Sequence, residues 1–263
     1  MSVTAPSLSE ALDRIAQVPT LLVALDFDGT LAPEVDDPEQ ARMLPAAQEA
    51  IRRLALLPGT PVALVSGRGL PSLERVAGVS DSVTLVGSHG VEMRYQGRER
   101  SLLGTHDLER RRLLGEVLAA SVDQHDGVWL EAKPVGFAVH TRLVTHDAAA
   151  EAQRSARAAV AASSLSDITE RAGKNVLEFA VRPATKGDGI VELRTLTGAD
   201  AVLFAGDDVT DEDALAALED GDLGLKCGAP PTHAQFCVPA PGDVAELLLQ
   251  LAEQRSVYVH RPE

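Results

Sequence analysis

From residue 21 to residue 31 the chain reads LLVALDFDGTL, the most informative stretch of its 263 residues. The five apolar residues at 21–25 predict a buried strand, because the run is too short for a helix of its own. This strand leads directly into Asp26 and Asp28 and then into a Gly-Thr turn. Two carboxylates at the end of a buried strand are costly to desolvate, and a divalent cation compensates that cost best. The stretch therefore predicts a strand that ends at a cation site.

Similar short apolar runs recur along the chain and alternate with segments of helical character. We expect strands at 21–25, 61–65, 82–86 and 201–205, and helices near 44–57, 70–77, 186–197, 211–219 and 242–254. This alternation predicts an α/β fold with a doubly wound, Rossmann-like parallel sheet that helices cover on both faces. In such a sheet, ligands bind outside the carboxyl ends of the strands.

The middle of the chain has a different pattern. We expect a helix, two strands, a second helix and two further strands at 107–122, 128–132, 136–143, 147–163, 166–172 and 175–181. This pattern predicts a small α+β cap inserted between two strands of the sheet, with hinges near Gly104-Thr105 and Arg182-Pro183. We therefore expect a core domain of residues 1–105 and 183–263 and a cap domain of residues 106–182.

The net charge of −15 argues against partners that require a basic protein surface. We expect no broad contact with nucleic acid or an anionic membrane, and an anionic substrate has to be attracted by local cations. The first twenty residues lack the apolar run of a signal peptide, and no stretch reaches the roughly 18 apolar residues of a membrane span. Cys227 and Cys237 have neither a redox nor a zinc spacing and are expected to be reduced thiols. We therefore expect a soluble, cytoplasmic protein.

Ser66-Gly67-Arg68 follows the strand expected at 61–65. A hydroxyl, a flexible backbone and a guanidinium together suit the oxygens of a phosphate. A turn with a surface arginine explains the same tripeptide equally well.

Lysine is rare in this chain, which has 24 basic residues but only four lysines, at positions 133, 174, 186 and 226. Because arginine does not replace lysine where a compact ammonium is needed, we expect lysines at such positions. Lys186 opens the helix expected at 186–197, although a cation at a helix N-terminus opposes the helix dipole. We therefore predict that Lys186 neutralises a bound phosphate rather than lying in solvent.

Five of the seven residues at 207–213 are acidic, directly after the strand expected at 201–205. Like charges at this density repel one another unless they bind a cation or cap a helix. Capping by Thr210 and the acids after it explains the second half of the run. It leaves Asp207 and Asp208 unexplained, so we predict that Asp207 binds a metal ion.

Together these motifs lie at the carboxyl ends of expected strands, in the order Asp26-x-Asp28, Ser66, Lys186, and Gly206-Asp207 with Asp211. The order resembles that of the haloacid dehalogenase-like phosphatases and covers about two thirds of the chain.

The resemblance implies a mechanism in which Asp26 attacks phosphorus and forms an aspartyl-phosphate. Asp28 would act as general acid and then general base, which requires a pKa raised by the acidic cluster. Ser66 and Lys186 would hold the phosphoryl oxygens.

The resemblance also implies a Mg²⁺ cofactor bound by Asp26, the backbone carbonyl of Asp28, and Asp207. Asp211 would orient a water on the metal.

Further motifs point to the substrate: Gly87-Ser88-His89-Gly90, Glu131-x-Lys133, His140-Thr141-Arg142 and Glu178. With the acidic run after residue 206, they resemble the trehalose-6-phosphate phosphatase family over roughly residues 20 to 240. The resemblance implies hydrolysis of trehalose 6-phosphate, with Gly67, Arg68, His89, Gly90, Glu131, Lys133 and Glu178 binding substrate.

Strand alternation places Glu131 and Lys133 on one face, where carboxylate and ammonium groups suit sugar hydroxyls. Without the family, a surface ion pair explains them better, and His140 and Arg142 carry weaker signals. The chain has Gly136 where the family often has serine, and Thr141 where it often has an aromatic residue. These departures put substrate affinity and selectivity in question.

Other functions compete with this interpretation. A phosphatase of sucrose 6-phosphate or mannosyl-3-phosphoglycerate would share the core motifs, and a phosphomutase would share the aspartyl nucleophile but exclude water. A sugar-phosphate sensor would bind without turnover. The sequence contains no glycosyltransferase domain, so we expect any functionally linked trehalose-phosphate synthase to be a separate protein.

Overall fold

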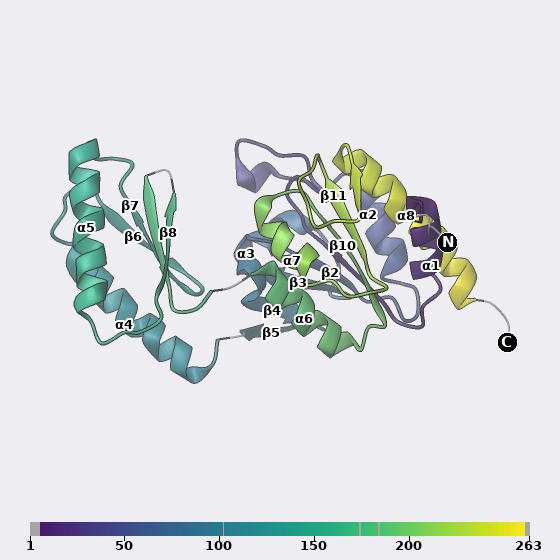
Figure 1. Cartoon of the computed structure of the whole chain (residues 1–263), viewed down its shortest axis with the longest axis horizontal. Helices are drawn as coiled ribbons and strands as arrows, with labels where there is room; N and C mark the ends of the chain where they lie inside the picture. Colours follow the sequence, from purple (N-terminus) through teal and green to yellow (C-terminus); the bar gives the residue numbers. More distant parts are fainter. Residues whose placement is uncertain (1–5, 102, 174, 184, 261–263) are drawn as a thin grey trace, which may run out of the picture. The chain divides into compact units, whose positions relative to one another are not determined.

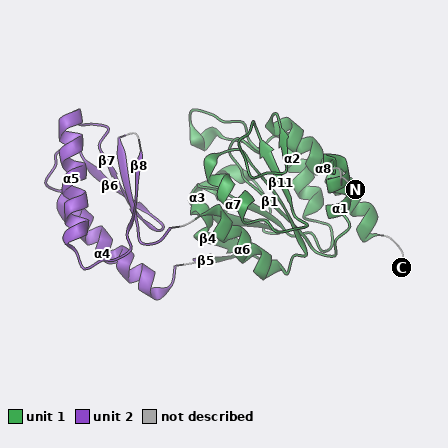
Figure 2. Ribbon diagram, in the orientation of Figure 1, with its two compact units in different colours: residues 1–100, 185–263 green, residues 101–184 purple. Residues whose placement is uncertain are grey.

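The computed structural model describes residues 6–101, 103–173, 175–183 and 185–260 and divides the chain into two compact units (Figure 2). The core unit consists of residues 1–100 and 185–263, and the inserted unit of residues 101–184. The cap expected at 106–182 lies within the inserted unit.

The core unit is built on an eight-stranded sheet (Figure 1). Its strand order is β12 (Phe236–Val238), β11 (Leu223–Cys227), β10 (Ala201–Gly206), β1 (Leu21–Leu25), β2 (Val62–Val65), β3 (Val83–Gly87), β4 (Glu92–Tyr95) and β5 (Arg98–Ser101). From β12 to β3 all neighbours are parallel, and β4 is antiparallel to β3. The doubly wound α/β fold is therefore confirmed, with an antiparallel edge.

Helices cover both faces of this sheet. One apolar cluster joins α1 (Leu8–Ile15), α2 (Pro45–Leu54), α3 (Leu70–Ala77) and α8 (Pro241–Val259) to one face, and another joins α6 (Lys186–Thr197) and α7 (Glu212–Ala216) to the other. Along β1, Leu21, Val23 and Leu25 belong to the first cluster, whereas Leu22 and Ala24 belong to the second. Burial on both faces explains why this strand is a continuous apolar run.

The structure contains elements that the sequence analysis did not predict: α1, β4, β5, β11 and β12. In β11, Gly224 and Lys226 interrupt the apolar run although the whole strand is buried. The strand β5 is exposed along its length, which suits the edge of a sheet. Three short 3₁₀ helices lie at Pro38–Gln40 (η1), Ser88–Gly90 (η2) and Val209–Asp211 (η3).

The inserted unit contains a four-stranded antiparallel sheet with the order β6 (Trp129–Lys133), β7 (Gly136–His140), β9 (Val176–Ala180) and β8 (Thr169–Gly173). The helices α4 (Thr105–Val122) and α5 (His146–Ala162) lie on one side of it (Figure 1). On that side, Phe137 packs against Gly115 and Arg111. The opposite face carries Trp129, Glu131 and Lys133, because side chains alternate along β6.

Among the described residues, no helix combines the length and the apolar character that crossing a membrane requires.

Candidate active site

The carboxyl ends of β1 and β10 bring together the acidic residues of two distant motifs. Leu25 pairs with Ala205 in register, so Asp26 follows one strand where Asp207 follows the other. One carboxylate oxygen from each of Asp26, Asp207 and Asp211 lies within 4.8 Å of the other two. Two of the predicted metal ligands, Asp26 and Asp207, are therefore neighbours, as the parallel pairing requires.

Lys186 lies inside this acidic cluster. Its Nζ donates to Oδ1 of Asp26 and to Oδ1 of Asp211, each at 2.6 Å. A capping box between Thr185 and Asp188 starts α6 directly before the lysine, which fixes where its side chain begins. The predicted place of Lys186, beside a candidate carboxylate nucleophile, agrees with this geometry.

Burial and charge shift the pKa values of these groups. Burial raises the pKa of Asp26 to about 8, against the opposing attraction of Lys186. Burial likewise raises the pKa of the Asp207 carboxyl. Burial opposes the charge on Lys186, but the attraction of Asp26 and Asp211 outweighs it and raises the pKa of the ammonium. Three carboxylates and one ammonium sum to −2 when all are ionised, so the cluster lacks positive charge.

A divalent metal ion fits this donor set. The cluster offers only oxygen ligands, which Mg²⁺ prefers, and its charge would be balanced by one divalent ion. Oδ2 of Asp26 is buried and has no hydrogen-bond partner among the described residues. Gly29, with φ of 81°, approaches Asp207 so closely that a Cβ there would lie 2.1 Å from its Oδ2. The close approach leaves the carboxylate of Asp207 room that no other residue type would give.

Asp211 is fully buried and holds the loop that carries Asp207. Its Oδ1 accepts from Lys186, and its Oδ2 accepts from the backbone N–H groups of Asp207 and Asp208, each at 2.9 Å. The predicted role of Asp211, orientation of a metal-bound water, is not tested by these contacts. They show a role in fixing the backbone of the loop.

Asp28 is not part of the acidic cluster. Both of its carboxylate oxygens accept from Arg68, at 2.6 Å from Nε and 2.6 Å from a terminal nitrogen. Its side chain faces Arg68 instead, and its predicted role as general acid and base stays a prediction.

Ser66, Gly67 and Arg68 form the turn after β2. Ser66 is buried, and its Oγ accepts from the backbone N–H of Arg68 at 3.1 Å. A Cβ on Gly67 would lie 2.7 Å from the imidazole of His89, so only glycine fits there. This turn thus packs directly against the second predicted substrate motif.

The Gly-Ser-His-Gly motif joins this turn to the start of α6. The N–H of His89 donates to the carbonyl of Ser66 at 3.1 Å. A Cβ on Gly90 would lie 2.7 Å from the carbonyl oxygen of Thr185, the N-cap of α6. Ser88 and His89 have φ values of 52° and 55°, a strained region for residues other than glycine that is found often at functional sites.

In the inserted unit, Glu131 is the centre of a polar cluster on the face away from the helices. It pairs with Lys133 and with Nε2 of His140, each at 2.7 Å. Burial opposes ionisation of Glu131, but these two partners lower its pKa. Ala138 pairs with Glu131 on one side and with Glu178 on the other, so both glutamates lie on this face. Their predicted sugar-binding role stays a prediction.

Trp129 and Arg142 extend this polar cluster. The rings of Trp129 and His140 stack with centroids 4.7 Å apart, and the guanidinium of Arg142 lies 5.0 Å from the indole ring. Trp129 belongs to none of the motifs found in the sequence. Its register opposite His140 became visible only with the strand pairing.

The two departures from the family pattern have structural explanations. A Cβ on Gly136 would lie 1.8 Å from the carbonyl oxygen of Phe179, so β7 and β9 approach too closely for serine. Thr141 is buried, and its Oγ1 accepts from Gln153 at 3.5 Å. Thr141 therefore fills an interior position of the inserted unit.

Three residues near the site were missed by sequence reasoning. Thr30 donates to Oδ1 of Asp207 at 3.1 Å. Glu92 accepts from Ser88 at 2.7 Å and from the first N–H of α3 at 3.1 Å. Lys226 lies beside the loop after β10. The sequence signals were the Gly-Thr turn after Asp28 for Thr30 and the rarity of lysine for Lys226.

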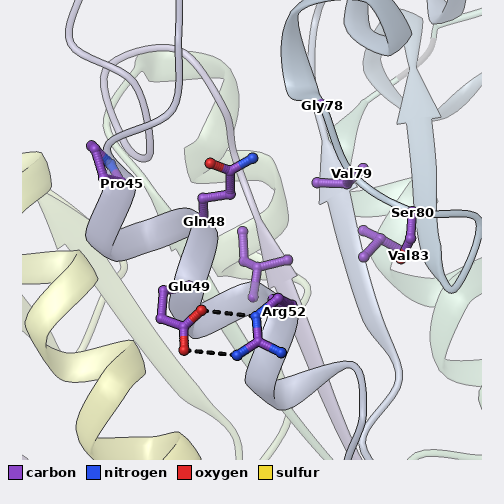
Figure 3. Close-up of a pocket in the computed structure, with 9 residues that line it drawn as sticks. Pro45, Gln48, Glu49, Arg52, Gly78, Val79, Ser80 and Val83 are labelled. Atoms are coloured by element: carbon purple, nitrogen blue, oxygen red, sulfur yellow. Dashed lines mark hydrogen bonds and ion pairs between the residues drawn. The ribbon is translucent and has the colours of Figure 1, made fainter.

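The core unit also has a hollow of about 380 Å³ between α2 and the segment that leads into β3. Figure 3 shows its wall, where Glu49 and Arg52 form an ion pair at 2.8 Å. None of the predicted site residues lines it.

The sequence model of the trehalose-phosphatase family matches residues 24–235. The trehalose-phosphate phosphatase of Mycobacterium avium is 32% identical over 255 residues, which cover 88% of this chain and 62% of that protein. The bifunctional trehalose-6-phosphate synthase/phosphatase of Thermoproteus tenax is 34% identical over 93% of this chain but only 34% of its own length. This chain thus spans less than two thirds of these two relatives.

A solved structure of Aspergillus fumigatus trehalose-6-phosphate phosphatase superposes with a TM-score of 0.72, at 25% identity, over 96% of this chain and 99% of that one. The family model covers the core unit from β1 to the end of the loop before β12, together with the whole inserted unit. The chain therefore belongs to the trehalose-phosphatase family.

Proposed function

We propose that this chain hydrolyses trehalose 6-phosphate to trehalose and phosphate, with Mg²⁺ as cofactor and through a phosphoryl-enzyme on Asp26. The observation that carries the proposal is the buried contact of Lys186 with Asp26 beside Asp207. Membership of the trehalose-phosphatase family, and the names of its relatives, support the choice of substrate.

In the first step, one carboxylate oxygen of Asp26 attacks phosphorus, and the bond from phosphorus to the sugar oxygen breaks. Lys186 keeps Asp26 oriented through its 2.6 Å contact and provides positive charge for the phosphoryl oxygens, which Ser66 also approaches. Asp26, Asp207 and the backbone carbonyl of Asp28 would hold Mg²⁺, which would neutralise charge on the phosphoryl group when bound.

The proton for the leaving sugar oxygen comes from Asp28, which must first be released from Arg68 and take up a proton from solvent. A phosphate dianion competes for the same guanidinium, because phosphate and carboxylate both accept its two N–H groups side by side. We therefore assign Arg68 two alternating partners: Asp28 without substrate, and phosphate with it. In the second step, water attacks phosphorus, the bond between the Asp26 oxygen and phosphorus breaks to release phosphate, and Asp28 takes the proton of the water.

The inserted unit supplies contacts to the sugar. Glu131, Lys133 and Glu178 offer acceptors and a donor on one face of the sheet, and a disaccharide presents many hydroxyls. The ion pair between Glu131 and Lys133 exchanges part of its contact for sugar hydroxyls. In this proposal, the inserted unit determines which phosphate ester the protein hydrolyses.

The experiment measures phosphate release from trehalose 6-phosphate with and without Mg²⁺, beside sucrose 6-phosphate and glucose 6-phosphate. We expect Mg²⁺-dependent turnover with preference for the trehalose ester. Asp26→Asn should lower kcat by roughly 10³-fold or more, because it removes the nucleophile. The control is Asp13→Asn, an exposed carboxylate on α1, which should behave as wild type.

Other outcomes would reject the proposal in distinguishable ways. Equal rates on all three esters would leave a phosphatase without the proposed sugar contacts. Loss of substrate without release of phosphate would indicate a phosphomutase. Binding of trehalose 6-phosphate without Mg²⁺-dependent turnover would indicate a sensor.

A functional link to a trehalose-phosphate synthase is part of the proposal. The relative from Thermoproteus tenax carries both activities in its name, and a synthase makes the ester that a phosphatase consumes.

A further inference from the structure

We infer that Lys226 is a positioning residue for the cation site, which it serves by fixing the backbone of Asp208, the residue that follows Asp207. The inference rests on the cation-dependent function proposed above. It adds a residue that binds neither the cation nor, by its contacts, any carboxylate of the acidic cluster.

The loop after β10 has to hold Asp207 at a defined place, because a Mg²⁺ ligand tolerates little error in position. On one side, Asp211 accepts from the N–H groups of Asp207 and Asp208 at 2.9 Å. These bonds fix the amide side of the loop only. The carbonyl of Asp208 accepts from the N–H of Asp211 at 3.2 Å, and a carbonyl oxygen can accept from a second donor as well.

Lys226 supplies that donor from the neighbouring strand. It pairs in register with Gly206, the last residue of β10, so its side chain starts beside the loop. Its Nζ donates to the carbonyl oxygen of Asp208 at 3.1 Å. The backbone of Asp208 is therefore held at its N–H by Asp211, and at its carbonyl by Lys226 together with the N–H of Asp211.

Glu212 anchors Lys226 in turn. Its Oε1 accepts from Lys226 at 3.1 Å, while its Oε2 accepts from Thr232 at 3.1 Å and from the N–H of His233 at 2.8 Å. With a side chain only 9% exposed, Lys226 has little conformational freedom left. This network joins the loop to β11 and to the segment after it, so a shift of Lys226 would move the loop.

The charge of Lys226 and its proposed positioning role have opposite expected effects on cation affinity. Lys226 is positive, so a purely electrostatic view predicts that its removal strengthens binding of a cation nearby. If Lys226 positions Asp207, its removal weakens that binding. Loss of a residue that orients a metal ligand typically costs roughly 10–100-fold in metal affinity.

The experiment measures Mn²⁺ binding to the full chain without substrate, by the electron paramagnetic resonance signal of free Mn²⁺, with displacement by Mg²⁺. We expect Lys226→Met to weaken binding by about tenfold or more. Arg194→Met is the matched control. It removes a partly buried ion pair with Asp222, which accepts from Val202 at the opposite end of β10. We expect the control to lower the midpoint of thermal unfolding and to leave Mn²⁺ affinity unchanged.

The double variant Lys226→Met with Glu212→Met removes the unpaired glutamate that the single variant leaves, and it serves if the single variant does not fold. We expect its Mn²⁺ affinity to stay low. Wild-type affinity in Lys226→Met, tighter binding there, or recovery in the double variant would each overturn the inference and leave the proposed function intact. Absence of Mn²⁺ and Mg²⁺ binding in the wild-type chain would reject the inference and the cation-dependent function together.

Discussion

At the scale of single residues, Asp26 and Lys186 combine burial with electric charge, although a charged group is normally more stable in water than in the protein interior. Both side chains are almost completely buried, yet the chemistry needs both charges. Their contact at 2.6 Å compensates one charge with the other, while Asp207 and Asp211 leave the cluster short of positive charge. In the proposed mechanism, a bound cation would therefore stabilise the folded protein and prepare Asp26 for attack at the same time.

This coupling makes the effect of Mg²⁺ depend on pH. Without a cation, the pKa of Asp26 is about 8, whereas an unfolded aspartate has a pKa of about 3.9. The folded state thus binds the proton more tightly, so the stability contributed by protonated Asp26 is complete below about pH 4 and is lost as the pH rises through 8.

Bound Mg²⁺ would have to displace the proton of Asp26. Below the pKa of Asp26, the affinity for Mg²⁺ should therefore rise by up to about tenfold for each unit of increase in pH. Thermal unfolding between about pH 6 and pH 8.5, with and without Mg²⁺, measures the effect. Asp26→Asn, which cannot ionise, is the control and should lose most of the pH dependence. An equal Mg²⁺ effect at every pH would contradict the assignment of Asp26 as a ligand.

The two cysteines should differ in reactivity. Burial raises the pKa of Cys227 to about 11, while Cys237 is exposed. At about pH 8 a disulfide reagent such as dithiobisnitrobenzoate should therefore label one thiol fast, and both only after unfolding, because the thiolate is the reactive form. Cys237→Ser should remove the fast phase. Fast labelling of that variant in its folded state would show that Cys227 is accessible.

Some residue contacts were outside the reach of sequence reasoning. The motifs identified Asp26, Asp207 and Lys186 because each follows or opens an element that the apolar pattern predicts. The pair of Asp28 and Arg68 joins residues 40 positions apart and depends on how β1 lies beside β2. No spacing in the sequence encodes that register.

At the scale of elements, α8 is tied to the rest of the core unit by one fully buried arginine. Arg255 is 0% exposed. Its donors reach Oγ1 of Thr60 and the carbonyl oxygens of Ala16, Val18, Pro19 and Gly59. These acceptors belong to the end of α1 and to the segments before β1 and β2. A single side chain thus satisfies the backbone where three elements meet.

Arg255→Met should lower the free energy of unfolding by about 3 kcal/mol or more, because it leaves several buried acceptors without a donor. Urea unfolding measures the loss. Arg14→Met on the exposed side of α1 is the control, and a surface change of this kind should stay within about 0.5 kcal/mol. Equal stability of the two variants would mean that water replaces the guanidinium.

Helices and strands were predicted correctly from the sequence where their buried residues form a clear apolar pattern. The strand at 21–25 and the helix at 186–197 were predicted with the bounds that the structure has, because one is a continuous apolar run and the other begins after Pro183. The helix α1 was missed although Ser7 and Glu10 form a capping box, a signal that was present in the sequence. The edge strand β5 has no apolar pattern to find, since all four residues are exposed.

At the scale of the whole molecule, the proposed function assigns catalysis to the core unit and substrate choice to the inserted unit. Both large apolar clusters of the core unit consist of core-unit residues alone, within the part of the chain that the structure describes. The inserted unit has buried apolar side chains of its own, which include Leu114, Leu118, Val139 and Leu177. Neither core depends on side chains of the other unit, so each unit should fold by itself.

Replacement of residues 102–184 by a flexible Gly/Ser linker of about ten residues should therefore give a folded core unit. We expect it to bind Mg²⁺ like the full chain, because Asp26, Asp207 and Lys186 all remain. Its activity on a small ester such as p-nitrophenyl phosphate should persist. Its kcat/KM for trehalose 6-phosphate should fall to the kcat/KM that it shows for this small ester, since the proposed sugar contacts are gone. Glu131→Ala with Glu178→Ala in the full chain is the milder counterpart, and it should lower kcat/KM for the sugar ester alone. If the shortened chain retained its preference for trehalose 6-phosphate, the residues that choose the substrate would have to lie in the core unit, and the assignment of Glu131, Lys133 and Glu178 would be wrong.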